Sequence, residues 1–420
     1  MRPPAHKTRL VQLAKEHGGL AARVAELRHQ LTEAERVLRG NELEMASYAP
    51  VYTLPNDVLK LILEELYEHN FGDQDTCCTT PHQDPLSITH TSRRWRAVAL
   101  SLPTIWTCMH LSRPHRLLRL WAERSAPLPI RVTCVFRETE QGGRQALKRY
   151  YARLRAILEH ASRLQHLSLS TDEPEFVCGV CELLQNQDLS ALLTLALRYE
   201  ASFTGGAATM SYIQLPTCPN LKSLTLTAIP YHNSLVSCSL PRLEALQLDG
   251  CGYLNSSSLD TISKAAPALV ELILKGAWPV LYLYDDTSEP ILLSELPSVK
   301  QLILHCYTVP RARMSTAVAQ LFLHTPASTI LTLRDTEESD VILRGLADDD
   351  AAQMLPLLEC LELTVLVGGE SGYSGLLHFL EKRESFGHPL KELRLGQTLQ
   401  EEMGAELLRS LGKLVAVSVL

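Results

Sequence analysis

Residues 221–226 read Leu-Lys-Ser-Leu-Thr-Leu, and residues 243–248 read Leu-Glu-Ala-Leu-Gln-Leu. In this spacing the last two leucines lie on one side of a β-strand, because successive side chains of a strand point to opposite faces. The same pattern, with a few replacements, occurs ten times toward the carboxyl terminus. The first positions of the copies are Leu164, Leu192, Leu221, Leu243, Leu269, Val299, Ser328, Leu358, Leu390 and Leu414. One such strand cannot bury its leucines alone, so we expect the copies to stack on one another.

The spacing of the copies predicts the architecture of residues 113–420. Successive copies begin 22 to 32 residues apart, and the chain of 420 residues contains 78 leucines. Both features are typical of leucine-rich repeats. We therefore predict an α/β fold in which this region forms an irregular leucine-rich-repeat solenoid of about ten repeats.

Residues 1–50 predict a long amphipathic helix. Apolar side chains recur at alternating spacings of three and four residues, with His17 and Asn41 as the polar exceptions. This spacing is that of the a and d positions of a heptad repeat. The apolar positions are Leu10, Leu13, Leu20, Val24, Leu27, Leu31, Ala34, Leu38 and Met45. A homodimeric coiled coil through residues 20–45, packing back onto the chain, and a solitary helix all fit this pattern.

Residues 51–112 predict a small helical domain. Thr53 precedes LPNDVLKLILEELYEHN, in which Pro55 suits a first helical turn and Asp57 complements the helix dipole. The apolar stripe that follows is too wide for a single shallow contact. One edge can face the domain's own core while the other edge faces a partner.

The same region resembles an F-box, in the form common among fungal F-box proteins. An opening Leu-Pro and an acidic residue precede the apolar helix, and Ser-x-x-Trp-Arg and Pro-x-x-Trp follow it. The matching residues are Leu54, Pro55, Asp57, Val58, Leu59, Ile62, Leu63, Leu66, Ser92, Arg93, Trp95, Arg96, Ala99, Leu100, Pro103 and Trp106. The insert at residues 71–85 is longer than the spacer usual in the family.

The resemblance implies a substrate-recognition subunit of a cullin–RING (SCF-type) ubiquitin ligase. Such a subunit docks the ligase's adaptor protein through the F-box and binds a target protein elsewhere, for protein degradation. The residues implied in adaptor binding, or in the packing beneath it, are Leu54, Pro55, Val58, Leu59, Ile62, Leu63, Trp95 and Val98. The alternative is a scaffold or interaction protein without ligase coupling, which the long insert favours.

A target protein is expected on the polar face of the predicted strands. Ile273, Ile303 and Ile330 come from successive copies of the pattern and suggest an apolar patch, flanked by Lys275, His305 and Arg334. Exposed apolar surface often marks a binding site. Strand propensity alone, or cover by residues 277–293, would also account for these isoleucines.

Composition excludes several other classes of partner. The chain has 40 basic and 47 acidic residues, and nucleic acids and anionic membranes require a basic face, which no overall surplus supplies here. A local basic patch stays open as an alternative. No run of 18 uncharged apolar residues predicts a membrane span, and the amino-terminal residues do not resemble a secretory signal. The 11 scattered cysteines suggest reduced thiols, in the cytoplasm or the nucleus.

No catalytic, cofactor or metal site is predicted. The nucleotide-binding glycine motifs and the His-Glu-x-x-His metal motif do not occur. Cys178 and Cys181 form a Cys-x-x-Cys pair, which can serve redox chemistry or supply half of a zinc site. Because a second ligand pair and a thioredoxin-like context are missing, we interpret both residues as structural thiols. The expected protein is not an enzyme.

Overall fold

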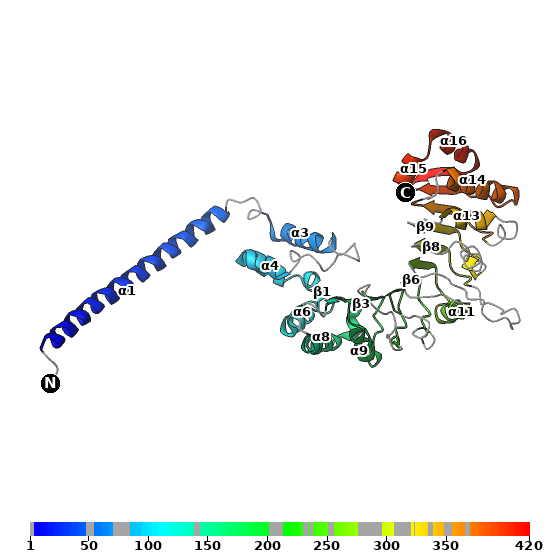
Figure 1. Ribbon diagram of the computed structural model, residues 1–420. Coiled ribbons are helices and arrows are strands. Elements are labelled where there is room, and N and C mark those ends of the chain that lie inside the picture. Colours follow the sequence, from blue (N-terminus) through cyan, green and yellow to red (C-terminus); the bar gives the residue numbers. More distant parts are fainter. Residues whose placement is uncertain are drawn as a thin grey trace. The chain divides into compact units, whose positions relative to one another are not determined.

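The computed structural model describes most of the chain in two compact units. The described residues are 4–47, 54–69, 85–137, 143–200, 213–229, 235, 238–250, 256–275, 296–305, 321–322, 324–334, 339–347, 355–365 and 370–420. The first unit, here called the helical unit, contains helices α1, α3, α4 and α5 (Figure 1). The second, the sheet unit, contains the strands and the remaining helices, from Leu102 onward.

The helical unit contains one long helix and three short ones. Their bounds are Pro4–Ser47 for α1, Asn56–His69 for α3, Pro85–Thr91 for α4 and Arg93–Leu100 for α5. The predicted amino-terminal helix is confirmed: it runs from Pro4 to Ser47 and continues through Gly18 and Gly19. Helix α3 packs against α5, whose first turn is capped where Ser92 Oγ accepts a hydrogen bond from the Trp95 N–H at 3.1 Å.

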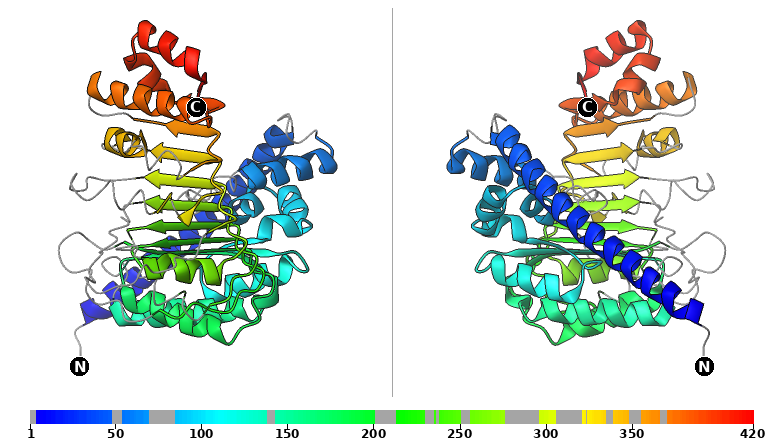
Figure 2. Two further views of the ribbon diagram at one scale, coloured as in Figure 1. Left: turned by 90° about the vertical axis from the view of Figure 1, so that its right-hand side faces the viewer. Right: turned by 90° about the vertical axis from the view of Figure 1, so that its left-hand side faces the viewer.

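The sheet unit is built on twelve parallel strands in chain order. The strands are β1 (Cys108–His110), β2 (Ile130–Phe136), β3 (Leu164–Thr171), β4 (Thr194–Tyr199), β5 (Ser223–Thr227), β6 (Ala245–Asp249), β7 (Glu271–Lys275), β8 (Gln301–His305), β9 (Ile330–Arg334), β10 (Cys360–Leu363), β11 (Glu392–Leu395) and β12 (Ala416–Val419). Figure 2 shows them stacked one above another. Each strand therefore pairs with the strands before and after it in the sequence.

The leucine pairs of the sequence pattern form continuous ladders across this sheet. Leu224, Leu246, Leu272, Leu302 and Leu331 are direct partners on successive strands. All five are buried, so each side chain covers its neighbours on both adjacent strands. Burial of a leucine stabilises the fold by about 1.5–3 kcal/mol, and the core of the sheet unit follows these ladders.

The helices between the strands lie along one face of the sheet (Figure 1). Crossovers between parallel strands are right-handed, so a strand order that never reverses places every crossover helix on the same face. These helices are α6 (His115–Arg124), α8 (Gly143–Leu158), α9 (Pro174–Gln185), α11 (Ser256–Ala265), α13 (Ser339–Ala347), α14 (Glu370–Ser385), α15 (Gln397–Glu402) and α16 (Ala405–Leu414), with short 3₁₀ turns η2 (Pro103–Trp106) and η3 (Ala161–Arg163). The side chains that alternate with the leucines along each strand lie on the opposite face of the sheet.

Aromatic side chains close the sheet unit next to β1. Trp106 of η2 is fully buried and packs on Trp121 of α6, with ring centroids 6.0 Å apart. The Arg124 guanidinium lies 4.7 Å from the Trp106 ring centroid. Trp106, the last residue of the F-box-like sequence, therefore belongs to the core of the sheet unit.

The prediction of an irregular leucine-rich-repeat solenoid of about ten repeats is wrong. The described residues form a single all-parallel sheet of 12 strands with helices, an α/β fold. The sequence pattern marks only strands with paired leucines, and it misses β1 and β2, whose buried residues include Met109, Val132 and Phe136. Leucine spacing reports which side chains are buried, whereas the architecture depends on how the backbones pair.

Candidate functional site

Helix α3 has one face in the core of the helical unit. Leu59, Leu63 and Tyr67 follow one another at intervals of four residues and are all buried. On α5, Val98 and Ala99 are buried as well. Because residues four apart lie on the same side of a helix, these side chains hold α3 in place through one face only.

The other face of α3 is an exposed apolar surface. Val58 is 38% exposed, Leu61 65%, Ile62 37% and Leu66 51%. We call these four side chains the α3 stripe. Single exposed apolar side chains are normal, whereas four on one helix form a contiguous patch of the kind that marks protein interfaces.

Polar contacts fix the start of α3 against α5. Arg94 Nε donates to Asn56 Oδ1 at 2.9 Å, and a second Arg94 nitrogen donates to the Leu54 carbonyl. On α5, Arg96 Nε donates to the Thr89 carbonyl at 2.8 Å, which ties α5 to α4. The stripe is therefore presented by an anchored helix rather than by a free one.

The structure divides the predicted adaptor-binding residues into three groups. Pro55, Val58 and Ile62 are exposed, and Leu54 and Trp95 are half-buried. Leu59, Leu63 and Val98 are buried and lie beneath the surface. The predicted set omitted Leu61, the most exposed member of the stripe, although its position three residues after Val58 places it on the same side of the helix.

The predicted target-binding residues lie on the strand face opposite the helices. Ile273 pairs directly with Ile303, and Lys275, His305 and Arg334 are partners along one row. Ile330 pairs with Gln301, so it lies outside the isoleucine row, and Thr332 stands opposite Ile303. Ile303 is only 5% exposed. Ile330 is therefore a diagonal neighbour of Ile303 rather than its direct partner, whereas the basic row is continuous.

The basic row of Lys275, His305 and Arg334 lies next to an acidic side chain whose pKa is shifted. Burial raises the pKa of the Asp249 carboxyl, and the positive charges of Lys275, His305 and Arg198 partly offset that effect. Asp249 pairs with Lys275 in the register of the sheet. The row is thus a mixed but mainly basic surface at the carboxyl ends of the strands.

Farther along the same face of the sheet, on β9 to β12, polar side chains form hydrogen bonds with one another. Glu362 is 6% exposed; it accepts from Thr332 Oγ1 at 2.8 Å and from Arg394 at 2.7 Å. Arg394 also donates to Glu392 at 2.8 Å, and Ser418 Oγ donates to Glu392 at 2.8 Å. This hydrogen-bond network connects β9, β10, β11 and β12 and stabilises this end of the sheet.

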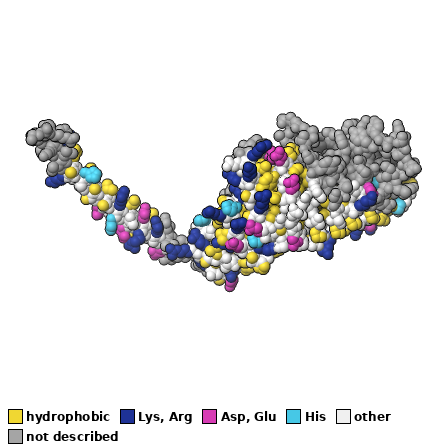
Figure 3. Space-filling view, turned by 90° about the horizontal axis from the view of Figure 1, so that it is seen from below, with side chains coloured by type: hydrophobic (Ala, Val, Ile, Leu, Met, Phe, Trp, Pro, Cys, Tyr) yellow, Lys and Arg dark blue, Asp and Glu magenta, His cyan; other side chains and the backbone are white. Residues whose placement is uncertain are grey.

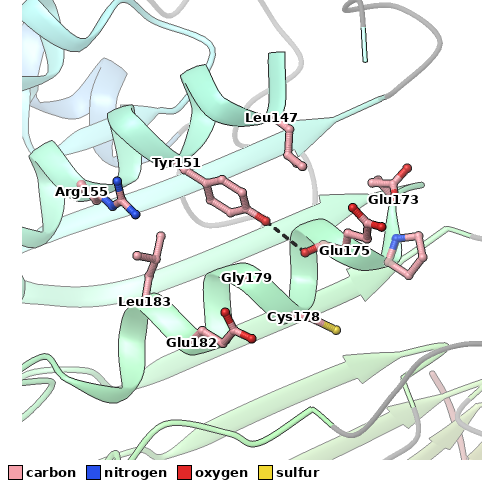
Figure 4. Close-up of a pocket in the computed structure, with 10 residues that line it drawn as sticks. Leu147, Tyr151, Arg155, Glu173, Glu175, Cys178, Gly179, Glu182 and Leu183 are labelled. Atoms are coloured by element: carbon pink, nitrogen blue, oxygen red, sulfur yellow. Dashed lines mark hydrogen bonds between the residues drawn. The ribbon is translucent and has the colours of Figure 1, made fainter. Parts of the chain in front are cut away.

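A groove of about 900 Å³ lies between α8 and α9. Figure 4 shows Tyr151 reaching from α8 to α9, where its hydroxyl donates to the Glu175 carbonyl at 3.0 Å. Burial, followed by the negative charges around it, raises the pKa of Tyr151 to about 12. Burial also raises the pKa of the Cys178 thiol that lines the groove. A thiol that stays protonated is a poor nucleophile, so Cys178 is not an activated group.

The second thiol of the Cys-x-x-Cys pair lies in the core. Cys181 is buried, and burial raises the pKa of its thiol. No group of three or more His, Cys, Asp or Glu side chains in the described part of the chain could hold a metal ion. Cys77 and Cys78 lie outside the described residues.

Comparisons with known proteins give no assignment. No protein-family model and no curated protein matches the chain. Of the helices that the structure describes, none has the length and apolar character needed to span a bilayer. The α3 stripe and the basic row of the sheet are therefore judged on their chemistry alone.

Proposed function

We propose that the chain is a substrate-recognition subunit of a cullin–RING (SCF-type) ubiquitin ligase. The observation that supports this function is the division of α3 into two faces. Leu59 and Leu63 are fully buried, whereas Val58, Leu61, Ile62 and Leu66 remain exposed. An anchored helix with an uncovered apolar face is suited to bind another protein.

In this proposal the two units have different tasks. The α3 stripe binds the adaptor subunit, and the strand face of the sheet unit binds a target protein. The chain itself forms and breaks no bond. It raises the effective concentration of the target near the ubiquitin-charged enzyme. No cysteine of the described residues forms a disulfide, which suits the reducing cytoplasm or nucleus where such ligases act.

Adaptor binding is tested by a pull-down with the purified adaptor and the full-length chain. The wild type should retain the adaptor, and Val58→Asp with Ile62→Asp should not. Each large anchor of an interface contributes about 2 kcal/mol or more, so the double variant should bind at least roughly 100-fold more weakly. Leu59→Asp is unsuitable because Leu59 is fully buried and its replacement would unfold the unit.

The matched control places two aspartates four residues apart on α4. Ser87 and Thr91 are both exposed, so Ser87→Asp with Thr91→Asp should leave adaptor binding unchanged. Circular dichroism checks that all variants are folded. A folded wild-type chain that retains no adaptor would contradict the proposal and favour a scaffold without ligase coupling.

Target binding is tested separately in cells. Ile273 is half-buried and Lys275 follows it on the same face, so Ile273→Lys with Lys275→Glu changes both the shape and the charge of the row. Proximity labelling should then lose the target proteins and keep the adaptor. An unchanged set of labelled proteins would place the target-binding surface elsewhere.

A further inference from the structure

Helix α1 presents an apolar seam that the described residues leave open. The helix has 44 residues, and every side chain from Gln12 to Asn41 is exposed. Leu20 is 66% exposed, Leu27 56% and Leu31 60%. Figure 3 shows hydrophobic side chains recurring among the charged ones along this helix. A long helix in water gains most of its stability from packing, so this seam needs a cover.

The seam has the repeat of a coiled coil. Its a positions are Leu10, His17, Val24, Leu31, Leu38 and Met45, and its d positions are Leu13, Leu20, Leu27, Ala34 and Asn41. Nine of these eleven successive positions are apolar, over about five heptads. A repeat of seven residues sustained over three to four heptads fits a second helix with the same repeat.

Outside the seam, charged and polar side chains of α1 form pairs along the helix. Arg36 contacts Glu33 at 2.7 Å, Arg39 lies 3.9 Å from Glu35, and Gln30 donates to Glu26 at 2.9 Å. These pairs of residues three or four apart support the helix and keep its outer face in water. The a and d positions therefore hold most of the large apolar side chains that a partner would cover, and Val37 is exposed beside them.

The charge of α1 differs between its two halves. Residues 4–28 contain five Lys or Arg and two Asp or Glu, a net charge of +3. Residues 29–47 contain two Arg and four Glu, a net charge of −2. Two copies lying antiparallel place each basic half beside an acidic half, whereas two parallel copies place like charges together.

We propose that α1 forms an antiparallel coiled coil with the α1 helix of a second copy of this chain. In an antiparallel pair each a position faces a d position. The arrangement centred near residue 29 places Leu27 opposite Leu31 and Leu20 opposite Leu38. It also places His17 opposite Asn41, so both polar positions of the seam find a hydrogen-bonding partner. A polar pair inside a coiled coil fixes its register.

The flanking charges agree with this orientation. Arg28 of one copy lies beside Glu35 of the other copy, and Arg9 lies beside Glu44. In a parallel, in-register pair Arg28 would lie beside Arg23 of the other copy, which is repulsive. Like charges next to a seam disfavour one orientation and thereby select the other.

The seam is large enough for a stable pair. Burying a leucine or valine removes roughly 60–120 Å² of apolar surface from water. The exposed seam residues Leu13, Leu20, Val24, Leu27, Leu31 and Leu38 give twelve such side chains in a pair, or roughly 700–1,400 Å². With the stems of the flanking residues, this reaches the lower bound of about 1,200 Å² for a stable interface.

An antiparallel pair has a consequence for the assembly. The two Ser47 residues, which end the helices, lie at opposite ends of the seam, about 54 Å apart at a rise of 1.5 Å per residue. After each Ser47 the chain continues toward the α3 helix of the same copy. The pair would therefore present two α3 stripes from opposite ends. The pairing itself depends only on α1 and holds whether or not α3 binds the ligase adaptor.

The state of association is measured on the full-length chain by light scattering after gel filtration. The wild type should have twice the mass of 46.8 kDa for one chain. Leu27→Asp with Leu31→Asp should give a single chain, because both residues lie in the central layer. The matched control is Ala25→Asp with His29→Asp, two exposed positions four residues apart outside the seam, and it should remain a dimer.

A charge reversal tests the orientation without disturbing the seam. Arg28→Glu should raise the dissociation constant of the dimer roughly tenfold, because the introduced carboxylate would then face Glu35 of the other copy. Arg28→Glu combined with Glu35→Arg should restore the wild-type affinity. Tighter association of Arg28→Glu would contradict the antiparallel orientation and support a parallel pair. A wild-type chain that stays monomeric at micromolar concentration, or a dimer that survives Leu27→Asp with Leu31→Asp, would overturn the pairing itself.

Discussion

The two faces of α3 should respond very differently to the same truncation. Leu63 is fully buried and Leu61 is 65% exposed, and the two residues are separated by half a turn. Leu63→Ala removes buried methyl groups and leaves a cavity, which costs about 2–5 kcal/mol. Leu61→Ala removes groups that already contact water, and such surface changes stay within about 0.5 kcal/mol.

Hydrogen exchange followed by mass spectrometry measures this difference inside the full-length chain. A loss of 2–5 kcal/mol should accelerate exchange of the amides of residues 56–69 by roughly 30-fold to several thousandfold, since about 1.4 kcal/mol corresponds to a factor of ten. Peptides from the sheet unit serve as the internal control and should be unchanged. Equal acceleration by Leu61→Ala and Leu63→Ala would refute the assignment of one buried and one open face.

Three further predictions concern the sheet unit. Burial, and then the charges of Arg131 and Arg198, lower the pKa of His166 to about 4, and burial followed by Arg113 lowers that of His110 to about 4. Between pH 6.5 and pH 4 the unfolded chain therefore binds more protons than the folded chain. The free energy of unfolding, measured with urea, should fall by about 1.4 kcal/mol per histidine for each unit that the pH is lowered in this range. His166→Gln should remove the contribution of His166, and a free energy of unfolding that does not change with pH would contradict the prediction. Arg383 is 2% exposed and donates hydrogen bonds to the carbonyls of Leu355 and Leu358 at 3.1 and 3.2 Å. Arg383→Met should therefore lower the free energy of unfolding by about 1–3 kcal/mol. A change below about 0.5 kcal/mol would show that these hydrogen bonds do not stabilise the fold. A methyl group at Gly179 would clash with the Tyr151 hydroxyl, so Gly179→Ala should displace the tyrosine ring and break its hydrogen bond to the Glu175 carbonyl. A thiol reagent should then label Cys178 faster than in the wild type, and an unchanged labelling rate would contradict this packing.

The leucine pattern predicted where the later strands lie but not the sheet as a whole. Leu224 and Leu246 fall in β5 and β6 because alternation along a strand is a local property of the chain. β1 has only three residues, with Met109 as its buried side chain, and no short pattern distinguishes such a segment from a loop. Pairing between backbones determines how far the sheet extends, and leucine spacing does not report it.

The same limit applies to the predicted sites. The isoleucines alone do not give the register, because the partner of Ile330 in β8 is Gln301 rather than Ile303. The residue between the two leucines of β9 is Thr332, and counting from those leucines would have given the correct row. For α3 the width of the apolar stripe did predict two faces. Which side is buried depends on packing against α5, which the sequence of α3 alone does not contain.

The most direct test of the account is the footprint of the ligase adaptor on the full-length chain by hydrogen exchange. We predict that saturating adaptor slows exchange in α3, residues 56–69, and in α5, residues 93–100, and leaves the strands of the sheet unchanged. Exchange in α3 that is identical with and without adaptor, or protection confined to the sheet unit, would contradict the proposed function.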